Sequence, residues 1–374
     1  MGADEVVILE QNHIAEGNKY GKVRGIRTSP DLATLGHPPQ RGGLWASNSN
    51  LSLERITSPE KVGLICMDKN TPPVGRFAPT PSGRMHLGNV FAAMIAWLSV
   101  RSRGGSLVLR MEDLDTQRTS EEYAALLRGD LKWLGLDWDE ETPPQSQRSA
   151  TYDRYFEQLR DLGLLYPCYC TRSQLHNVNA PHLSDGTYVY AGTCRNLANP
   201  PAGRAPSWRV RVPDKEYSLT DLAQGEFRQN LTTDCGDFVV RRADGVYVYQ
   251  LAVTVDDGEA GVTEVVRGMD LLGSAPRQMY LQELFGFAHP AYGHVPMLLA
   301  ADGRRLSKRD RDLDLGELQK RMSAQQLLGQ LAFAAGLLER YEPVSAKELA
   351  TVFSWDRLQQ EAITIDTNNS CFFP

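Results

Sequence analysis

Two short motifs contain residue types that bind phosphate. In HLGN, from His86 to Asn89, an imidazole and a glycine stand where a predicted strand gives way to a helix. Gly88 lets a nucleotide approach the backbone, and an imidazole at the positive end of a helix can donate a hydrogen bond to an α-phosphate. In LSKRD, Lys308 on a glycine-containing loop offers a mobile cation for a leaving pyrophosphate. Each motif alone also fits a role without catalysis: His86 could be a simple helix cap, and Lys308 could be a solvated side chain.

The predicted elements place the first motif at the edge of a sheet. Residues VGRFAPT, from Val74, read as a strand, and PSGRMHLGN leads into the apolar helix VFAAMIAWLSVRS. SLVLRMEDLD reads as a second strand ended by acidic residues, and a helix follows near Glu121 to Leu134. A strand, a helix and a strand in this order form a parallel crossover unit, whose ligand site lies beyond the carboxyl ends of the strands. HLGN and MEDLD both fall at those ends.

Composition and periodicity divide the chain into five parts. We expect a poorly ordered extension (1–73), the first half of a Rossmann-like catalytic domain (74–165), an irregular insertion (166–235), the second half of that domain (236–312) and a helical C-terminal segment (313–374). Met67, shortly before the first strand, is a second candidate start of the native product, and a genuine flexible extension is the alternative.

Within these parts, further elements can be predicted. The insertion contains the short strand SWRVRV. After it, DFVVRRADG, VYVYQLAVTVDD and EVVRGMD alternate like strands, and a helix is expected around Arg277 to Phe285. Two helical segments, near Leu315 to Leu338 and Ala346 to Glu361, are expected to close the chain.

Composition excludes several classes of protein. The chain of 374 residues is 41% hydrophobic and 23% charged, which suits a sizeable globular core and excludes a fibre. No apolar stretch approaches the roughly 20 residues of a membrane span, and the start lacks a signal sequence, so we expect a cytosolic protein that contacts no membrane. Six cysteines are too few for a disulfide framework and favour reduced thiols or metal ligands. The net charge of −6 argues against a general polyanion binder.

Taken together, the motifs resemble those of a known family. HLGN and LSK, in this order, resemble the HIGH and KMSKS signatures of class I aminoacyl-tRNA synthetases. GRFAPTPSGRMHLGN, LRMEDLDTQR, YQLAVTVDD and VVRGMDLL resemble the glutamate-specific branch of that class, over about Val74 to Asp310. The resemblance implies an α/β fold in which a Rossmann-like parallel sheet carries an insertion between its two halves. Asn89 replaces the last His of the signature and keeps a hydrogen-bonding side chain.

The resemblance also implies a glutamate site. Two carboxylates and one ammonium require cations and an anion, and the planar fork of arginine can hold a carboxylate bidentately. The family pattern maps the site onto Arg76, Glu112, Tyr249 and Arg267, together with the substrate-facing turn Phe77, Ala78, Pro79 and Thr80. Glu112, at a predicted strand end, would take the amino group. Singly, each residue also fits a structural role: the arginines at the surface, Glu112 in an ion pair and Tyr249 in a core strand.

The number of residues after the LSKRD motif restricts which branch of the family the sequence can resemble. Full glutamyl-tRNA synthetases continue past their KMSKS loop into large helical anticodon-binding domains. The residues between Asp310 and the end of this sequence leave no room for such a domain. We therefore expect a branch of the family that lacks it.

A pattern of cysteines further restricts the branch of the family that the sequence resembles. Cys168-Tyr-Cys170, followed by Tyr190-Ala-Gly-Thr-Cys194, resembles the zinc site of the glutamyl-queuosine tRNA(Asp) synthetase family. Three thiolates and one phenolate oxygen would form a closed, tetrahedral, structural site for one Zn²⁺ per chain and would pin an insertion that lacks a core of its own. Free cysteines beside a packed tyrosine are the alternative. His176 and His182 are rival fourth ligands.

This family resemblance implies a two-step reaction. Glutamate and ATP, with Mg²⁺ on the phosphates, would give glutamyl-adenylate and pyrophosphate, with His86, Gly88, Asn89 and Lys308 around the phosphates. The glutamyl group would then pass to the queuosine base in the anticodon of tRNA(Asp), and we expect a monomer. The alternatives are a truncated glutamyl-tRNA synthetase, a non-catalytic tRNA-binding paralogue and a small adenylyltransferase, the last of which explains neither MEDLD nor VVRGMD.

Overall fold

The computed structural model describes residues 71–176, 189–304 and 314–365 of the chain. Nearly all of the predicted N-terminal extension lies outside the described residues, and so does Lys308 of the LSKRD motif. Regular structure in the described part begins at Val74, where the sequence predicts the first strand.

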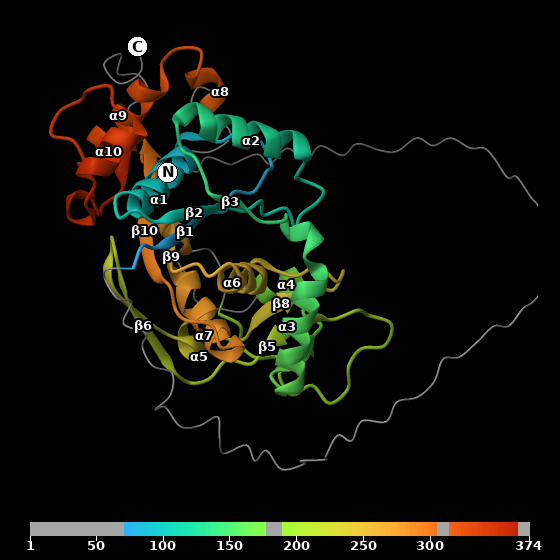
Figure 1. Ribbon diagram of the computed structural model, residues 1–374. Coiled ribbons are helices and arrows are strands. Elements are labelled where there is room, and N and C mark those ends of the chain that lie inside the picture. The colour runs from blue at the N-terminus through green and yellow to red at the C-terminus, as the bar shows by residue number, and fades with distance from the viewer. Residues whose placement is uncertain (1–70, 177–188, 305–313, 366–374) are drawn as a thin grey trace, which may run out of the picture. The chain divides into compact units, whose positions relative to one another are not determined.

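Five parallel strands form the main sheet, in the order β10-β9-β1-β2-β3. The strands are β1 (Val74–Phe77), β2 (Ser106–Leu109), β3 (Glu140–Glu141), β9 (Glu264–Gly268) and β10 (Ala291–Val295). The helices that connect neighbouring parallel strands are α1 (Leu87–Arg101), α2 (Glu121–Leu134) and α7 (Ala275–Phe285) (Figure 1). The parallel α/β fold is therefore confirmed, and it brings β1 and β9, from distant parts of the chain, side by side.

Local sequence signals set the bounds of the helices. Ser120 caps α2 by accepting a hydrogen bond from the backbone N–H of Tyr123, and Gly135 ends that helix with φ of 73°. The observed bounds of α2 are those that the sequence predicts. α1 is buried along almost its whole length, because it contacts β1, β9 and the C-terminal helix α10 (Ala346–Val352).

The insertion contributes a second, antiparallel sheet and a hairpin. The sheet has the order β4-β5-β8, and β6 pairs with β7 in the hairpin. The strands are β4 (Leu165–Cys168), β5 (Ser207–Val210), β6 (Glu216–Asp221), β7 (Gly225–Asn230) and β8 (Phe238–Arg241), and the nearby helices are α3 (Ser149–Asp161), α4 (Arg172–His176) and α5 (Leu231–Asp234). The predicted strand SWRVRV is confirmed as β5. Because β8 follows residue 235, the sheet joins residues on both sides of the predicted boundary.

One predicted strand is wrong. The residues YQLAVTVDD form most of a helix, α6 (Tyr249–Glu259), and not a strand. Every residue from Leu251 to Asp257 is buried, so the helix has no polar face that would show a period of 3.6 residues. The β-branched residues of the segment then imitate a buried strand.

The C-terminal segment is only partly helical: the segment predicted from Leu315 to Leu338 is two separate helices, and the helix predicted from Ala346 to Glu361 ends at Val352. Its helices are α8 (Leu315–Leu318), α9 (Ala324–Ala334) and α10, and 3-10 turns occur at η2 (Gln145–Gln147), η3 (Met269–Ser274) and η5 (Trp355–Arg357). A short strand that the sequence does not predict, β12 (Ile363–Ile365), pairs in parallel with β11 (Leu298–Ala300). This pairing ties the end of the described chain to the segment that follows β10.

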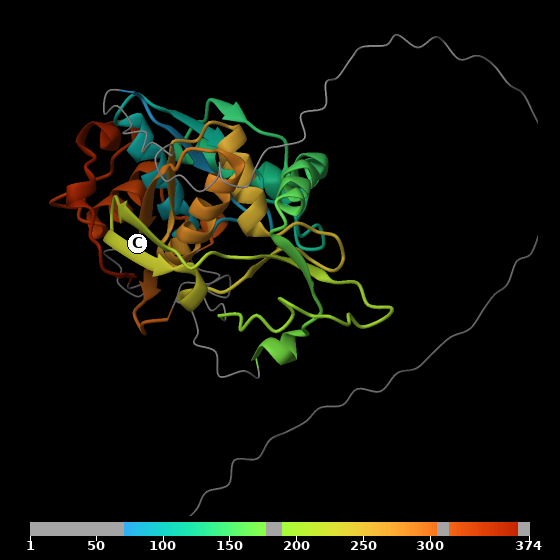
Figure 2. The ribbon, with the colours of Figure 1, turned by 90° about the horizontal axis from the view of Figure 1, so that it is seen from below.

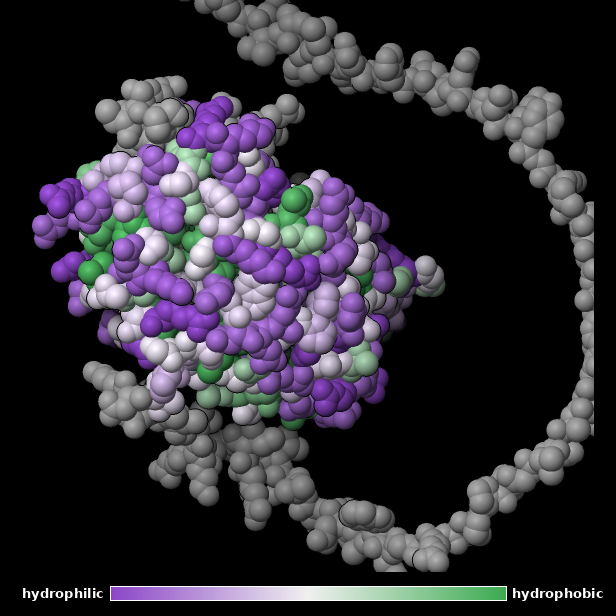
Figure 3. All heavy atoms as spheres, turned by 45° about the horizontal axis from the view of Figure 1, so that its top comes forward, coloured by the Kyte–Doolittle hydropathy of each residue, from purple (hydrophilic) through white to green (hydrophobic). Residues whose placement is uncertain are grey.

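The apolar side chains gather mainly in two large clusters. The first lies among α1, α2, the main sheet and the C-terminal helices, and the second lies among α3, α6, α7 and the strands of the insertion. On the face shown in Figure 3, hydrophilic side chains predominate and hydrophobic ones form small separate groups. Within the described parts of the chain, every helix is too short or too polar to cross a bilayer.

Candidate active site and metal centre

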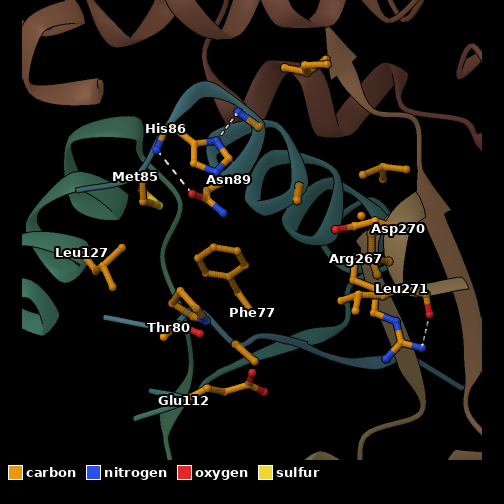
Figure 4. A pocket seen from close by; sticks show the side chains of 18 of the residues that line it. Phe77, Thr80, Met85, His86, Asn89, Glu112, Leu127, Arg267, Asp270 and Leu271 are labelled. Carbon is orange, nitrogen blue, oxygen red and sulfur yellow. Dashed lines mark hydrogen bonds between the residues drawn. The ribbon is translucent and has the colours of Figure 1, made fainter. Parts of the chain in front are cut away.

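A cavity of about 580 Å³ opens at the carboxyl ends of the strands of the main sheet (Figure 4). Its walls include every described residue that the sequence predicts for the glutamate and phosphate sites: Arg76, Phe77, Ala78, Pro79, Thr80, His86, Gly88, Asn89, Glu112, Tyr249 and Arg267. Lys308 lies outside the described residues. The undescribed segment that carries it lies between Arg304 and Asp314, and the backbone of Asp314 pairs with that of His86.

His86 is the N-cap of α1, and this role fixes its chemistry. Its Nδ1 accepts a hydrogen bond from the backbone N–H of Gly88 at 3.1 Å. The backbone N–H of His86 in turn donates to Oδ1 of Asn89 at 3.3 Å, which completes a capping box (Figure 4). Because Nδ1 accepts, the proton of the neutral ring lies on Nε2, which can donate to a phosphate oxygen. Capping and phosphate binding are therefore compatible roles for His86.

Gly88 leaves room for the imidazole of His86. A Cβ atom at this position would lie 3.0 Å from Cε1 of His86 and 3.1 Å from its Nδ1. A side chain at position 88 would therefore push the ring that the backbone N–H holds. Asn89, which replaces the His of the family signature, uses its oxygen for the cap and keeps its amide NH₂ as a donor.

Arg76 lies in β1 and is buried beneath the cavity. Its Nη1 donates to the carbonyl oxygen of Val266 at 2.9 Å, and its Nε lies 3.5 Å from a carboxylate oxygen of Asp257. Among the described residues, no hydrogen-bond acceptor meets this Nε with good geometry. Arg76 also lines the cavity, so its guanidinium can offer a charge to a ligand carboxylate.

Arg267, in the neighbouring strand β9, is held more firmly. Its Nη1 donates to Oε1 of Gln278 at 2.8 Å, and its Nε donates to Nε2 of His294 at 3.0 Å. Longer bonds of 3.3 Å reach the hydroxyl of Tyr249 and the carbonyl oxygen of Leu271. Figure 4 shows the last of these bonds at the rim of the cavity. The guanidinium is therefore oriented before any ligand arrives.

Glu112 lies opposite, in the loop after β2, which ends at Leu109, so this residue does not end a strand as the sequence predicts. Its backbone N–H donates to the carbonyl oxygen of Pro79 at 3.0 Å. Nη2 of Arg110 donates to its carboxylate at 3.3 Å. Burial raises the pKa of Glu112 above its ordinary value, against the opposing charges of Arg110 and Arg76. The ammonium of a bound amino acid would lower the pKa again and keep the carboxylate ionised.

Tyr249 begins α6, and its hydroxyl accepts the bond from Arg267. Burial raises its pKa, so the side chain stays a neutral phenol whose proton can be donated into the cavity. The turn from Phe77 to Thr80 follows β1 and lines the cavity, where it offers shape and backbone groups as the sequence predicts.

A charged network that the sequence does not predict lies beneath these residues. Arg110 is completely buried, and its Nη1 donates to Asp257 at 2.6 Å. Asp256 lies 3.6 Å from Nε of the same arginine and accepts hydrogen bonds from Tyr152. The strands and α6 thus place Arg76, Asp257, Arg110 and Glu112 in one chain of alternating charge. The charged residues are visible in LRMED and TVDD, but their pairing joins residues far apart in the sequence.

The predicted metal ligands also come together. The sulfurs of Cys168, Cys170 and Cys194 lie within 4.8 Å of one another. The distance from Cys170 Sγ to Cys194 Sγ is 3.6 Å, and the hydroxyl of Tyr190 lies 3.5 Å from Cys168 Sγ and 3.8 Å from Cys170 Sγ. The side chain of His176 and the whole of His182, the rival ligands, lie outside the described part of the chain.

These distances fit a tetrahedral zinc ion. With Zn–S bonds of about 2.3 Å and a Zn–O bond of about 2.0 Å, neighbouring sulfurs are about 3.8 Å apart and sulfur and oxygen about 3.5 Å apart. The backbone N–H of Cys194 donates to the hydroxyl oxygen of Tyr190 at 2.8 Å, as expected for an oxygen that acts as a ligand. The residues present therefore fit a closed structural site, and the cluster can hold a metal ion.

Arg209 of β5 supports this cluster, a role that the sequence does not predict. Its Nε donates to Cys168 Sγ at 3.2 Å, and its guanidinium lies over the Tyr190 ring at 3.7 Å from the centroid. Although burial alone raises the pKa of the Cys168 thiol, the Tyr190 hydroxyl and the charge of Arg209 lower it to about 7. The arginine thus favours the thiolate form that metal binding requires.

The fold and the cavity together define a class of protein. The family model for the catalytic domain of class I tRNA synthetases (E and Q) matches residues 74–368. A solved structure of a glutamate tRNA ligase from Elizabethkingia meningosepticum, in complex with its amino acid, superposes with a TM-score of 0.67 at 26% identity and covers 79% of this chain and 67% of that chain. The glutamate-tRNA synthetase of Elizabethkingia anophelis gives a TM-score of 0.68 at 26% identity and covers 80% and 69%.

Relatives with higher sequence identity than these two structures identify a family within the class I tRNA synthetases. The Glutamyl-Q tRNA(Asp) synthetase of Nitratidesulfovibrio vulgaris is 44% identical over 296 residues, which cover 75% of this chain and 91% of the relative. The enzyme of the same name from Symbiobacterium thermophilum is 45% identical over 308 residues, which cover 78% and 95%. The chain therefore belongs to the class I tRNA synthetases for glutamate and glutamine and, within them, to the Glutamyl-Q tRNA(Asp) synthetase family.

Proposed function

We propose that the protein activates glutamate with ATP and transfers the glutamyl group to the queuosine base in the anticodon of tRNA(Asp). The activation step is supported by one observation: Arg76, Arg267 and Glu112 line the same cavity as the N-terminus of α1. Two buried cations and one carboxylate match the charges of glutamate, and the helix N-terminus suits a phosphate. The choice of acceptor rests on the family of the chain.

In the first step, an oxygen of the glutamate α-carboxylate attacks the α-phosphorus of ATP. The bond from this phosphorus to the bridging oxygen breaks, pyrophosphate leaves, and glutamyl-adenylate remains. His86 Nε2–H and the backbone N–H groups of α1 stabilise the charge that builds on the α-phosphate, and Lys308 holds the pyrophosphate. Mg²⁺, when bound with ATP, neutralises phosphate charge. Because the site residues only bind and orient, the enzyme needs no nucleophile of its own.

In the second step, a hydroxyl of the queuosine cyclopentenediol attacks the acyl carbonyl of the adenylate. The new ester bond forms, AMP leaves, and the hydroxyl proton passes to solvent. Cys168, Cys170, Tyr190 and Cys194 take no part in either step. They would hold a structural Zn²⁺ that fixes the fold of the insertion.

The test is transfer of labelled glutamate, with ATP, to matched tRNA(Asp) preparations that carry either queuosine or unmodified guanine. We expect label on the queuosine-containing tRNA alone. Equal label on tRNA(Glu) regardless of queuosine would contradict the proposed acceptor and indicate a truncated glutamyl-tRNA synthetase. An absence of both label and pyrophosphate exchange would indicate a non-catalytic tRNA-binding paralogue.

A further inference from the structure

A chain of three buried side chains ends at the cavity. Asp221 is the last residue of β6, His294 lies in β10, and Arg267 lies in β9. Oδ2 of Asp221 lies 2.6 Å from Nδ1 of His294, and Nε of Arg267 lies 3.0 Å from Nε2 of the same imidazole. His294 is completely buried, and the other two residues are at most 5% exposed. The imidazole therefore connects an insertion residue to an arginine that lines the cavity.

The hydrogen bonds allow one protonation state of this imidazole. Arginine has donors and no acceptor, so Nε2 of His294 must be unprotonated to accept the bond from Arg267. The ring proton then lies on Nδ1 and is donated to Asp221. Burial, and after it the charge of Arg267, hold the pKa of His294 down at about 4 against the opposing effect of Asp221. Burial would raise the pKa of Asp221, but the bond with His294 lowers it, so the carboxylate stays ionised.

The two oxygens of Asp221 have separate partners. Oδ1 accepts the backbone N–H groups of Ala223, Gln224 and His294, each at 3.0 Å, while Oδ2 meets the imidazole. Further bonds attach the tip of the β6–β7 hairpin to β10: the backbone N–H of Leu222 donates to the Tyr292 carbonyl at 2.8 Å, and Nε2 of Gln224 donates to the His294 carbonyl at 2.8 Å. Figures 1 and 2 both show the hairpin alongside β10.

We propose that Asp221 and His294 are positioning residues that orient Arg267 for the amino-acid substrate, and that the hairpin of the insertion thereby sets the affinity for glutamate. The inference rests on the proposed function, in which Arg267 binds a carboxylate of glutamate. A purely structural role for Asp221 would use Oδ1 alone, since its bonds from Ala223 and Gln224 shape the turn of the hairpin and its bond from the His294 backbone N–H attaches the hairpin to β10. The contact of Oδ2 with the imidazole is the part that reaches the cavity.

Asp221→Asn separates the two roles. The three backbone N–H groups retain the amide oxygen at the Oδ1 position, so the NH₂ group must face Nδ1 of His294. The imidazole then has to carry its proton on Nε2, where it meets the Nε–H of Arg267, and two donors oppose each other. An Asp→Asn change that forces the wrong histidine tautomer is known to be severe when the imidazole acts in catalysis.

The experiment measures glutamate-dependent ATP–pyrophosphate exchange on the full chain. For Asp221→Asn we expect KM for glutamate to rise about tenfold or more, because a buried charged group loses its partner, with KM for ATP and kcat at saturating glutamate within about twofold. Glu226→Gln, on the exposed face of the same hairpin, is the matched control and should change none of these values. His294→Gln keeps an acceptor for Arg267 and should raise KM for glutamate less than His294→Leu does.

A second measurement reads the tautomer without activity. In protein labelled with ¹⁵N at histidine, the His294 signals, assigned by their loss in His294→Gln, should report Nδ1–H in the wild type and Nε2–H in Asp221→Asn. Nε2–H in the wild type would overturn the inference. So would an active wild type whose KM for glutamate is unchanged in Asp221→Asn, or changed only in step with KM for ATP. A wild type with no glutamate-dependent exchange would instead contradict the proposed function.

Discussion

The cavity and the cysteine cluster hold their polar side chains by different means. In the cavity, Arg76 and Arg267 stand in strands of the main sheet and Glu112 in the loop after β2, next to the larger apolar cluster of the protein. The small apolar cluster around the cysteines consists of Tyr166, Cys168, Tyr190 and Cys194, with Cys170 and Leu175 against it, so three of its four central members are predicted ligands. The comparison indicates that packing orders the first site, whereas the second has little core of its own, so we expect a metal ion to order it.

The largest effect should come from the ion network beneath the cavity. Arg110→Met would leave the carboxylates of Asp256, Asp257 and Glu112 without their shared buried cation. Breaking a buried network by removing one partner costs about 3–5 kcal/mol, a large part of the stability of a typical domain. The free energy of unfolding from urea titration checks this. Arg154→Met is the control, because the ion pair of this exposed arginine with Glu259 should contribute less than about 1 kcal/mol. Equal losses for both variants would contradict the account.

Removal of the metal should unfold the region around the cysteine cluster and leave the main sheet and α1 folded. Chelation is expected to release one Zn²⁺ per chain and to abolish the hydrogen-exchange protection of the peptides around Cys168 and Cys194. Peptides from α1 should keep their protection, because the main sheet and its core hold that helix. Cys168→Ser should lose zinc, while Cys235→Ser, at a buried cysteine outside the cluster, should retain it. A protein that purifies metal-free with the cluster region fully protected would refute the metal site.

Loss of the anionic group of the cavity should weaken amino-acid binding. Glu112→Gln is expected to raise KM for glutamate about a hundredfold, because a hydrogen bond between charged partners contributes about 1.5–3 kcal/mol. Initial rates of pyrophosphate exchange measure this. Asp113→Asn is the matched control: the next carboxylate along the chain bonds Ser146 outside the cavity, so its loss should leave KM nearly unchanged.

The acid limb of activity should depend on the same carboxylate. Burial raises the pKa of Glu112, and the residue must be ionised to bind an ammonium. As the pH falls through this raised pKa, Glu112 takes up a proton and KM for glutamate should rise. Glu112→Gln should flatten this limb, and what remains in the variant belongs to the substrate's own carboxylates. An identical pH profile in both proteins would exclude Glu112 as the titrating group.

The smallest effect should come from the phosphate end of the cavity. Gly88→Ala would place a Cβ atom 3.0 Å from the His86 ring and displace Nε2 from the phosphate. We expect kcat to fall about tenfold with stability little changed, because misplacing a catalytic group by a fraction of an ångström is costly. Gly129→Ala in α2 is the control, since nothing lies within 4 Å of its Cβ and alanine should stabilise the helix by about 1 kcal/mol.

The parts of the fold that could be predicted are those with local signals. The bounds of α2 follow from Ser120 and Gly135, and HLGN identifies the start of α1. α6 could not be predicted, because a helix buried on all sides loses its amphipathic period.

The presence or absence of a local sequence signal also separates the site residues that were predicted from those that were missed. The residues that line the cavity belong to motifs that the family pattern locates. Their supports do not: Asp221 and His294 are 73 positions apart, and Arg110 and Asp257 are 147 apart. Only the folded chain brings these partners together, so a single sequence contains no signal for the pairing.

The most direct test of the account is amino-acid-dependent ATP–pyrophosphate exchange by the intact protein, with glutamate, glutamine and aspartate compared at equal concentrations, with and without tRNA. The cavity, with Arg76 and Arg267 facing Glu112, predicts exchange with glutamate and at most traces with the other two, because glutamine lacks the second charge and aspartate is one methylene too short. Exchange that is equal for the three amino acids, or absent for all of them, would contradict the assignment of this cavity as a glutamate-activating site.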